Sequence, residues 1–289
     1  MKEKIIRSCS YRIHEDGSLS LADAVNAKGA KCAHICTDPV GNYVIGAGYL
    51  SGSVLVARYE SDGRMVPTQQ IFHQGHSVVP RRQESAHAHS STVYSGWKGV
   101  LVPDLGTDKV MNYDFDRGSG ILSPNSKQPS LDVKPGEGPR HLVFHPSLPV
   151  AYLLTEIGNH IYVYDYNSSD RTFQQTQTIS VLPKEYHGIS YCAELIISGD
   201  GRFLYSSNRG HDTISAFTIQ KKQADWKFWD TLTAAERGPD ISALESEKRP
   251  SLWPTRIRMS FVSLNGIRNR GIWGRFAADR MCRPRPVLF

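Results

Sequence analysis

Apolar and polar residues alternate in short segments that recur along this chain at an interval of about fifty residues. Three copies lie between Ser85 and Ile219, and a weaker copy precedes them. Each copy contains three short apolar strands joined by turns that carry Pro, Gly, Asn or Asp, and then a less regular fourth strand. The copies begin at His34 (HICTDPVGNYVIGAGYLSGSVLVARYESDGRM), His89 (HSSTVYSGWKGVLVPDLGTDKVMNYDFDRGSGIL), His141 (HLVFHPSLPVAYLLTEIGNHIYVYDYNSSDRTF) and Glu194 (ELIISGDGRFLYSSNRGHDTISAFTIQ). This repeat predicts an all-β fold, a β-propeller of four-stranded blades that bury their faces against one another.

The two ends of the chain lack the full pattern. The N-terminal segment CSYRIHEDGSLSLADAV resembles only the third strand, turn and fourth strand of a blade, and the pattern stops after Ile219. We therefore expect a β-propeller domain over residues 1–220, with about four recognisable blades plus fragments. Residues 221–289 are expected to form a divergent basic tail, partly disordered or poorly packed, because they lack period-two alternation. The functional alternative is a basic arm that binds nucleic acid or acidic membrane.

Charge is unevenly distributed along the chain. The net charge is +6, but residues 237–289 hold eleven Lys and Arg against four Asp and Glu. The preceding residues hold 23 against 24, so the repeat region is nearly neutral, which argues against a nucleic-acid partner. A signal-peptide core and a run of about 18 uncharged apolar residues are both lacking, so we expect no membrane partner and a cytoplasmic location. The five cysteines are expected to be reduced thiols.

Propeller geometry predicts where polar side chains converge. In each blade the innermost strand begins, and the second strand ends, on the same face of the ring, at the mouth of the central channel. His, Arg and carboxylate side chains at those places can supply a general base and groups that stabilise an anion. The first-strand starts hold His87, His89, Arg140, His141 and Glu194, and the second-strand ends hold Asp104, Glu156, Arg209 and His211.

Structural roles stay open for several of these side chains. The two histidines of the second blade can hydrogen-bond to the backbone and close the channel. Arg140 can pair with a carboxylate beside its own turn. Asp104 and Glu156 occupy equivalent places in successive blades and can cap the turn that follows each of them. Arg209 lies in NRGHD, where Asn, Gly and Asp are ordinary turn formers but Arg has no turn-forming purpose.

Other kinds of site are not expected. Cys32, His34 and Cys36 alternate along one strand, and residues at that spacing point the same way instead of closing a tetrahedron around zinc. The sequence contains no G-x-S-x-G elbow, phosphate-binding loop or dinucleotide fingerprint. We therefore expect neither a metal nor a cofactor.

Five ordered motifs resemble the seven-bladed β-propeller lactonase family, which includes the propeller type of 6-phosphogluconolactonase and the carboxy-cis,cis-muconate cyclase. The motifs are PRRQESAHAHSS (80–91), VLVPDLGTDKV (100–110), GEGPRHLVFHP (136–146), YLLTE (152–156) and FLYSSNRGHDTISAF (203–217). The resemblance extends over residues 8–220. It implies a catalytic set of His89 (or His87), Arg140, Glu156 and Arg209. Blade geometry adds further candidates for substrate binding, namely His87, His141, Asp104, Glu194 and His211.

The function that the resemblance implies is hydrolysis of a small anionic sugar lactone, with 6-phospho-D-glucono-1,5-lactone of the pentose phosphate pathway as the expected substrate. Glu156 or His89 would activate water, while Arg140 and Arg209 hold the phosphate or the developing oxyanion. The alternatives are a lactonising carboxy-cis,cis-muconate cyclase and a non-catalytic propeller that binds a partner. Compared with seven blades the chain is shortened at both ends. Its open blade edges predict that the chain self-associates and that its activity is low.

Overall fold

The computed structural model describes residues 6–219, except 30, 39, 95 and 97, together with three later strands. All regular elements of the described residues are strands, grouped mainly into four sheets. The first sheet contains β3 (Cys32–Thr37), β4 (Tyr43–Gly48), β5 (Ser53–Tyr59) and β6 (Met65–Phe72). The second contains β7 (Thr92–Tyr94), β8 (Gly99–Asp104), β9 (Lys109–Asp116), β10 (Ile121–Pro124) and β11 (Ser130–Asp132). The third contains β12 (Pro139–Phe144), β13 (Val150–Thr155), β14 (His160–Asn167) and β15 (Thr172–Ser180). The fourth contains β16 (Tyr191–Ile197), β17 (Phe203–Arg209), β18 (Thr213–Thr218) and β19 (Lys227–Thr233).

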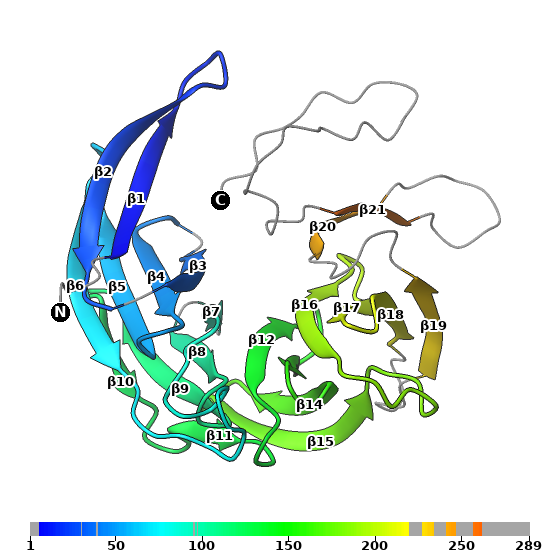
Figure 1. The fold of residues 1–289 in the computed structure, drawn as a ribbon. Coiled ribbons are helices and arrows are strands. Elements are labelled where there is room, and N and C mark those ends of the chain that lie inside the picture. The colour runs from blue at the N-terminus through cyan, green and yellow to red at the C-terminus, as the bar shows by residue number, and fades with distance from the viewer. Residues whose placement is uncertain are drawn as a thin grey trace.

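The four sheets are propeller blades, as the repeat predicts. Strands adjacent in sequence pair antiparallel in each sheet, and the blades lie side by side in an arc (Figure 1). The first strands β3, β7, β12 and β16 line the inside of the arc, and β6, β10, β15 and β19 lie on its outside (Figure 1). The irregular fourth strand of the second blade is split in two, because β10 and β11 both pair with β9. Asn112 holds the two parts together through hydrogen bonds to the backbone of Gln128 and Asn125.

The hydrophobic core lies between neighbouring blades, because strand side chains alternate between the two faces of each sheet. In β8, Val100 and Val102 pack toward the first blade, whereas Leu101 packs toward the third. In β13, Leu153 faces the second blade and Leu154 faces the fourth. All five side chains are fully buried. Burial of each such side chain contributes about 1.5–3 kcal/mol, so each blade is stabilised mainly by its neighbours.

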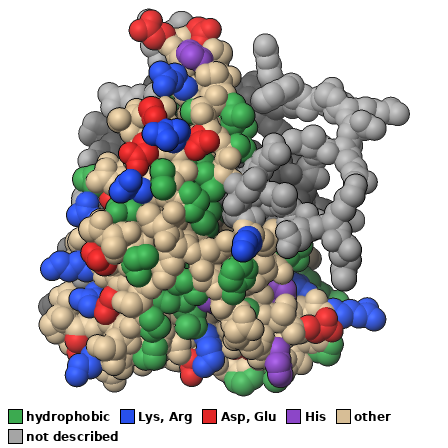
Figure 2. Space-filling view, turned by 90° about the vertical axis from the view of Figure 1, so that its left-hand side faces the viewer, with side chains coloured by type: hydrophobic (Ala, Val, Ile, Leu, Met, Phe, Trp, Pro, Cys, Tyr) green, Lys and Arg blue, Asp and Glu red, His purple; other side chains and the backbone are tan. Residues whose placement is uncertain are grey.

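The hairpin of β1 (Ile6–Ile13) and β2 (Leu19–Ala27) extends beyond the first blade (Figure 1). It contains the third-strand, turn and fourth-strand pattern that the N-terminal sequence predicts. Its Val25 packs against Ala57 and Met65 of the first blade, but several large apolar side chains of the hairpin are exposed. These are Tyr11, Ile13, Leu19 and Leu21. Figure 2 shows this side of the molecule, where hydrophobic side chains lie among charged ones.

Most of the predicted tail, residues 221–289, lies outside the described residues. Within it, β19 pairs with β18 and completes the fourth blade, and β20 (Ile241–Ser246) pairs with β21 (Ile257–Phe261). The division of the chain at residue 220 stays a prediction. No helix among the described residues is long and apolar enough to cross a membrane.

Candidate active site

The third and fourth blades contribute polar side chains where the first strand begins and the second strand ends. Arg140 is the second residue of β12, and Glu156 directly follows β13. Pro139 pairs with Thr155 and Tyr191 pairs with Arg209, so the start of each first strand lies beside the end of the second. This antiparallel pairing brings Arg140, Glu156 and Arg209 to the same end of the third and fourth blades.

The first strands of three blades are irregular where they reach the site. Register shifts lie at Cys32/His34 in β3, at Pro139/His141 in β12 and at Cys192/Leu195 in β16. Bulges of this kind interrupt the strict alternation of side chains and are common beside active sites. The bulge in β12 allows the adjacent residues Arg140 and His141 to serve the same site, since Arg140 bonds to Glu156 and the His141 ring contacts His89. Within the bulge in β16, the carbonyl of the buried Ala193 accepts a hydrogen bond from Arg140.

Glu156 is the centre of the arrangement. Arg140 Nε donates to its Oε2 at 2.9 Å, and Arg209 Nη2 lies 3.2 Å from the same oxygen. His89 Nε2 lies 3.6 Å from Oε2, and Arg82 Nη2 donates to Oε1. Burial by itself would raise the pKa of Glu156, but the surrounding positive charges, led by Arg140 and Arg209, lower it to about 2. Glu156 is therefore ionised at neutral pH and is a weak base, suited to aligning the three guanidinium groups.

His89 is the better candidate for a general base. Burial, followed by the charge of Arg140 and by His141, lowers its pKa well below 6.5, so the imidazole is neutral at pH 7. Its Nδ1 is buried and has no hydrogen-bond partner among the described residues. The segment that carries His89 is tied to the third blade, because the Ser90 hydroxyl donates to the Arg140 carbonyl at 2.7 Å. This segment is not the start of a strand as expected, since β7 begins at Thr92 and only an isolated bridge joins Ala88 to Asp104.

A second titratable group lies beside His89. His141 Nδ1 is 2.6 Å from Glu194 Oε1, and the His141 ring makes edge contacts at 5.5 Å with both His89 and His34. Burial raises the pKa of Glu194, and burial together with Arg140 lowers the pKa of His141 well below 6.5. The pKa of Glu194 is thus shifted in the opposite direction from that of Glu156, and the imidazole of His141 is neutral at pH 7.

Three other predicted site residues lie away from Glu156. Asp104 is completely buried, and its carboxylate accepts hydrogen bonds from His73 and from the amides of His87, Gly106 and Thr107. It therefore holds the segment that carries His89 and does not face a ligand. His87 bonds through Nδ1 to the Tyr49 carbonyl at 2.8 Å and stacks on the Tyr49 ring, whose edge in turn contacts His89.

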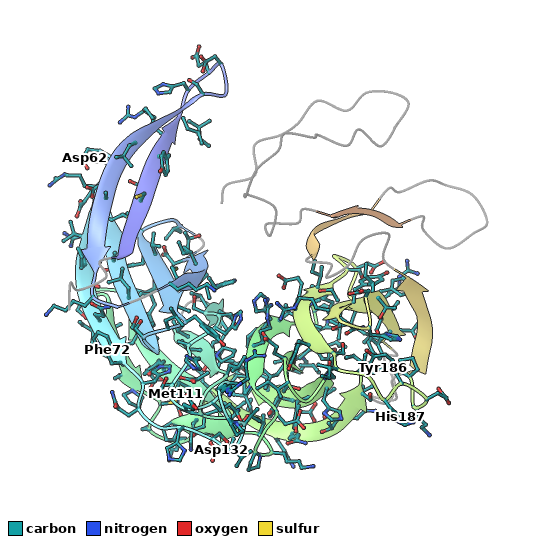
Figure 3. All side chains as sticks on the ribbon, viewed as in Figure 1. Asp62, Phe72, Met111, Asp132, Tyr186 and His187 are labelled. Atoms are coloured by element: carbon teal, nitrogen blue, oxygen red, sulfur yellow. The ribbon has the colours of Figure 1, made fainter. Side chains whose placement is uncertain are left out.

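His211 belongs to the turn between β17 and β18. Among the described residues, its contacts are outside the Glu156 cluster, which consists of Glu156, Arg82, Arg140, Arg209 and His89. Its Nδ1 lies 2.6 Å from the Thr213 hydroxyl, and its ring packs on Tyr186 with centroids 4.3 Å apart. Tyr186 follows β15, and Figure 3 shows it away from the inner strand β12. His211 therefore has Thr213 and Tyr186 as its partners, whereas Arg209, two positions earlier, pairs with Glu156.

Sequence reasoning missed two residues that reach the site. Arg82 comes from the connection between the first and second blades, bonds to Glu156 and lies over the Tyr191 ring with 4.8 Å to the centroid. His34, considered only as an unlikely zinc ligand, contacts His141. The motif PRRQ contains Arg82, but its position in a loop outside the strand repeat concealed its role. The described residues contain no group of three His, Cys, Asp or Glu side chains arranged to hold a metal ion.

Comparison with known proteins gives consistent matches. A family model described as "Lactonase, 7-bladed beta-propeller" matches residues 3–246. A 6-phosphogluconolactonase of Bacillus subtilis is 30% identical over 232 residues, which are 80% of this chain and 65% of that protein. An uncharacterized protein of Lactococcus lactis subsp. cremoris is 37% identical over 195 residues, 68% of this chain and 55% of the relative. The structure of a periplasmic gluconolactonase of Pseudomonas aeruginosa superposes with a TM-score of 0.75 at 28% identity, covering 83% of this chain and 67% of the other. The chain thus spans about half to two thirds of the length of these relatives.

Proposed function

The chain belongs to the seven-bladed β-propeller lactonase family, and on that basis we propose that it hydrolyses a sugar-derived lactone, with 6-phospho-D-glucono-1,5-lactone as the substrate and 6-phosphogluconate as the product. Relatives named 6-phosphogluconolactonase support this substrate class. The single observation that carries the proposal is the position of Glu156 between Arg82, Arg140 and Arg209, beside the neutral imidazole of His89.

His89 acts as the general base in this proposal. A neutral imidazole can accept a proton from water as the water oxygen attacks the ring carbonyl, and such transfer contributes about 10²–10⁴-fold to a rate. Glu156, with its pKa held at about 2, does not take the proton but keeps the guanidinium groups aligned. This role separates the two residues that the sequence alone leaves as equal candidates for the base.

The arginines receive the negative charge of the substrate. Arg140 lies deepest, with 11% of its side chain exposed, and is proposed to stabilise the oxyanion that forms on the attacked carbonyl. Arg82 and Arg209 are more accessible, with 27% and 28% of their side chains exposed, and are proposed to bind the phosphate. A planar guanidinium suits this role because it can donate two parallel hydrogen bonds to phosphate oxygens.

The proposal is tested by following acid production from 6-phosphoglucono-lactone and from unphosphorylated glucono-lactone, above the spontaneous rate. Carboxy-cis,cis-muconate is supplied in a parallel assay with product analysis. Faster hydrolysis of the phosphorylated lactone supports the proposal. Lactone formation from the muconate would favour the cyclase, and lactone binding without any turnover would favour a non-catalytic propeller. The cytoplasmic location, the lack of nucleic-acid and membrane partners, and self-association stay predictions.

A further inference from the structure

His141 and Glu194 form a pair of titratable side chains beside the Glu156 cluster. Their side chains come from neighbouring inner strands, β12 and β16, and meet at 2.6 Å between Nδ1 and Oε1. The pair is within reach of the site, because the His141 ring contacts His89 and 27% of the Glu194 side chain is exposed. The bulge in β16 sets Glu194 beside the Ala193 carbonyl that Arg140 binds. The same end of the two strands therefore carries both groups.

The two carboxylates of the site have opposite surroundings. Glu156 pairs with three arginines, whereas the ion pair of Glu194 within the described residues is with His141. Besides each other, the groups that face the Glu194–His141 pair are His34 from β3, His89 from the segment before β7, and Arg140, Arg209 and Glu156. The pKa of Glu156 is lowered and that of Glu194 is raised. When the pKa values of two carboxyl groups in one site are shifted apart, one commonly stays ionised and the other commonly donates a proton.

We propose that the His141–Glu194 pair is the general acid of the site, which protonates the ring oxygen of the lactone as the carbon–oxygen bond breaks. This inference rests on the proposed lactone hydrolysis and adds two catalytic residues to it. A leaving alkoxide is a strong base, so a neighbouring acid that supplies its proton lowers the barrier to ring opening.

The proton balance of the proposed reaction is complete. The water oxygen bonds to the carbonyl carbon, the π-electron pair of the carbonyl moves onto its oxygen, and the water passes one proton to His89. The carbonyl double bond re-forms from that electron pair in the next step. The ring carbon–oxygen bond then breaks, its electron pair stays on the ring oxygen, and that oxygen takes the proton shared by His141 and Glu194. The new carboxylic acid releases its proton to solvent, and the proton on His89 returns to the His141–Glu194 pair, which restores both groups. One lactone and one water give one hydroxy acid, with no other reactant.

The test uses the single variants Glu194→Gln and His141→Ala of the full chain, assayed with 6-phosphoglucono-lactone. Each change is expected to lower kcat by about 10²-fold, because the leaving oxygen loses its proton donor. Added imidazole is expected to restore activity to His141→Ala in proportion to its concentration, because it replaces the ring that shares a proton with Glu194. The matched control is His160→Ala. His160 pairs with Glu137 at 3.0 Å in the same blade but outside the Glu156 cluster, so any loss in that variant should not respond to imidazole.

Thermal melting of each variant first establishes that it is folded, and Glu194→Gln provides the answer if His141→Ala is not. Losses below tenfold in folded variants, or a loss in His141→Ala that imidazole leaves unchanged, overturn the role of the pair. Absence of lactone hydrolysis by the parent chain rejects the proposed function and this inference with it. Parental hydrolysis with unaffected variants rejects the inference alone.

Discussion

Arg82 donates a hydrogen bond to Glu156, although the two residues are 74 positions apart and Arg82 lies in the connection between the first and second blades. Arg82 can reach because the preceding turn is fixed by Gln83, whose buried side chain bonds to the Val79 amide at 3.1 Å and to the Leu105 carbonyl at 2.8 Å. The contact connects the loop after the first blade to the end of the second strand in the third blade. It also adds a third guanidinium group to the Glu156 carboxylate, which already pairs with Arg140 of β12 and Arg209 of β17.

Arg82 should therefore decide between phosphorylated and neutral lactones. We expect Arg82→Gln to raise KM for 6-phosphoglucono-lactone by about tenfold or more, since a charge-assisted hydrogen bond contributes about 1.5–3 kcal/mol. KM for glucono-lactone should change little. Steady-state kinetics on both substrates measure this ratio, and Arg81→Gln is the control for loss of an adjacent exposed arginine. Equal effects on the two lactones would assign Arg82 to holding the loop.

Arg209 should contribute mainly to turnover. Its guanidinium is positioned by the Cys192 carbonyl at 3.0 Å and by Glu156, so its loss removes a fixed positive charge from the site. We expect Arg209→Ala to lower turnover by about 10²-fold with little loss of stability. The matched control is Arg202→Ala, just before the opposite end of β17, where an exposed arginine pairs with Asp200. Unchanged kinetics in folded Arg209→Ala would remove this residue from the mechanism.

Glu156→Gln should also lower turnover by about 10²-fold, because the amide keeps the shape of the side chain but loses the charge that aligns three arginines. The rate is measured together with the melting temperature, which reports whether the released arginines destabilise the fold. If activity survives the change, Glu156 is a cap for the turn after β13 and the arginines are held by other groups.

The pH dependence of kcat/KM should report His89. Its pKa is lowered well below 6.5, so the imidazole is in the basic form at neutral pH and becomes protonated only on acidification. The rate should thus be level near pH 7 and fall as the pH drops through that lowered pKa. The fall in kcat/KM at acidic pH is measured in a series of buffers for the parent and for His89→Asn. In the variant this fall should disappear, together with most of the activity. If the fall in kcat/KM at acidic pH persists in His89→Asn, another residue is the base.

The exposed face of the β1–β2 hairpin should promote self-association. Leu19 and Leu21 are 62% and 59% exposed, and an unpaired strand edge with apolar side chains readily pairs with another chain. Size-exclusion chromatography with light scattering is expected to show a species larger than a monomer. The double change of Leu19→Lys and Leu21→Glu should shift it toward the monomer, whereas Ile189→Lys, at another exposed apolar position, should not. A parent chain that elutes as a monomer would disprove this prediction.

The blades themselves could be predicted from the sequence because their information is local. Alternation in segments such as Val100 to Val102 specifies which side chains face each neighbouring blade. The repeat interval specifies how many strands lie between equivalent positions in successive blades. The same regularity located Arg140, Glu156 and Arg209, because the start of a first strand and the end of a second strand always meet in an antiparallel sheet.

Only the tertiary structure decided what each equivalent position does. Asp104 and Glu156 both end a second strand, yet Asp104 is satisfied by His73 and backbone amides whereas Glu156 receives arginines. The difference arises from side chains that approach from elsewhere: His73 and Arg82 both lie in the connection after β6, outside the strand repeat. The bulges beside His141 and Glu194 also interrupt the alternation of side chains, so a periodic sequence pattern does not predict them. The repeat thus determined the backbone positions of the candidate site. Loops and bulges, whose contacts are non-local, determined which charges surround Glu156 and which side chains pair beside it.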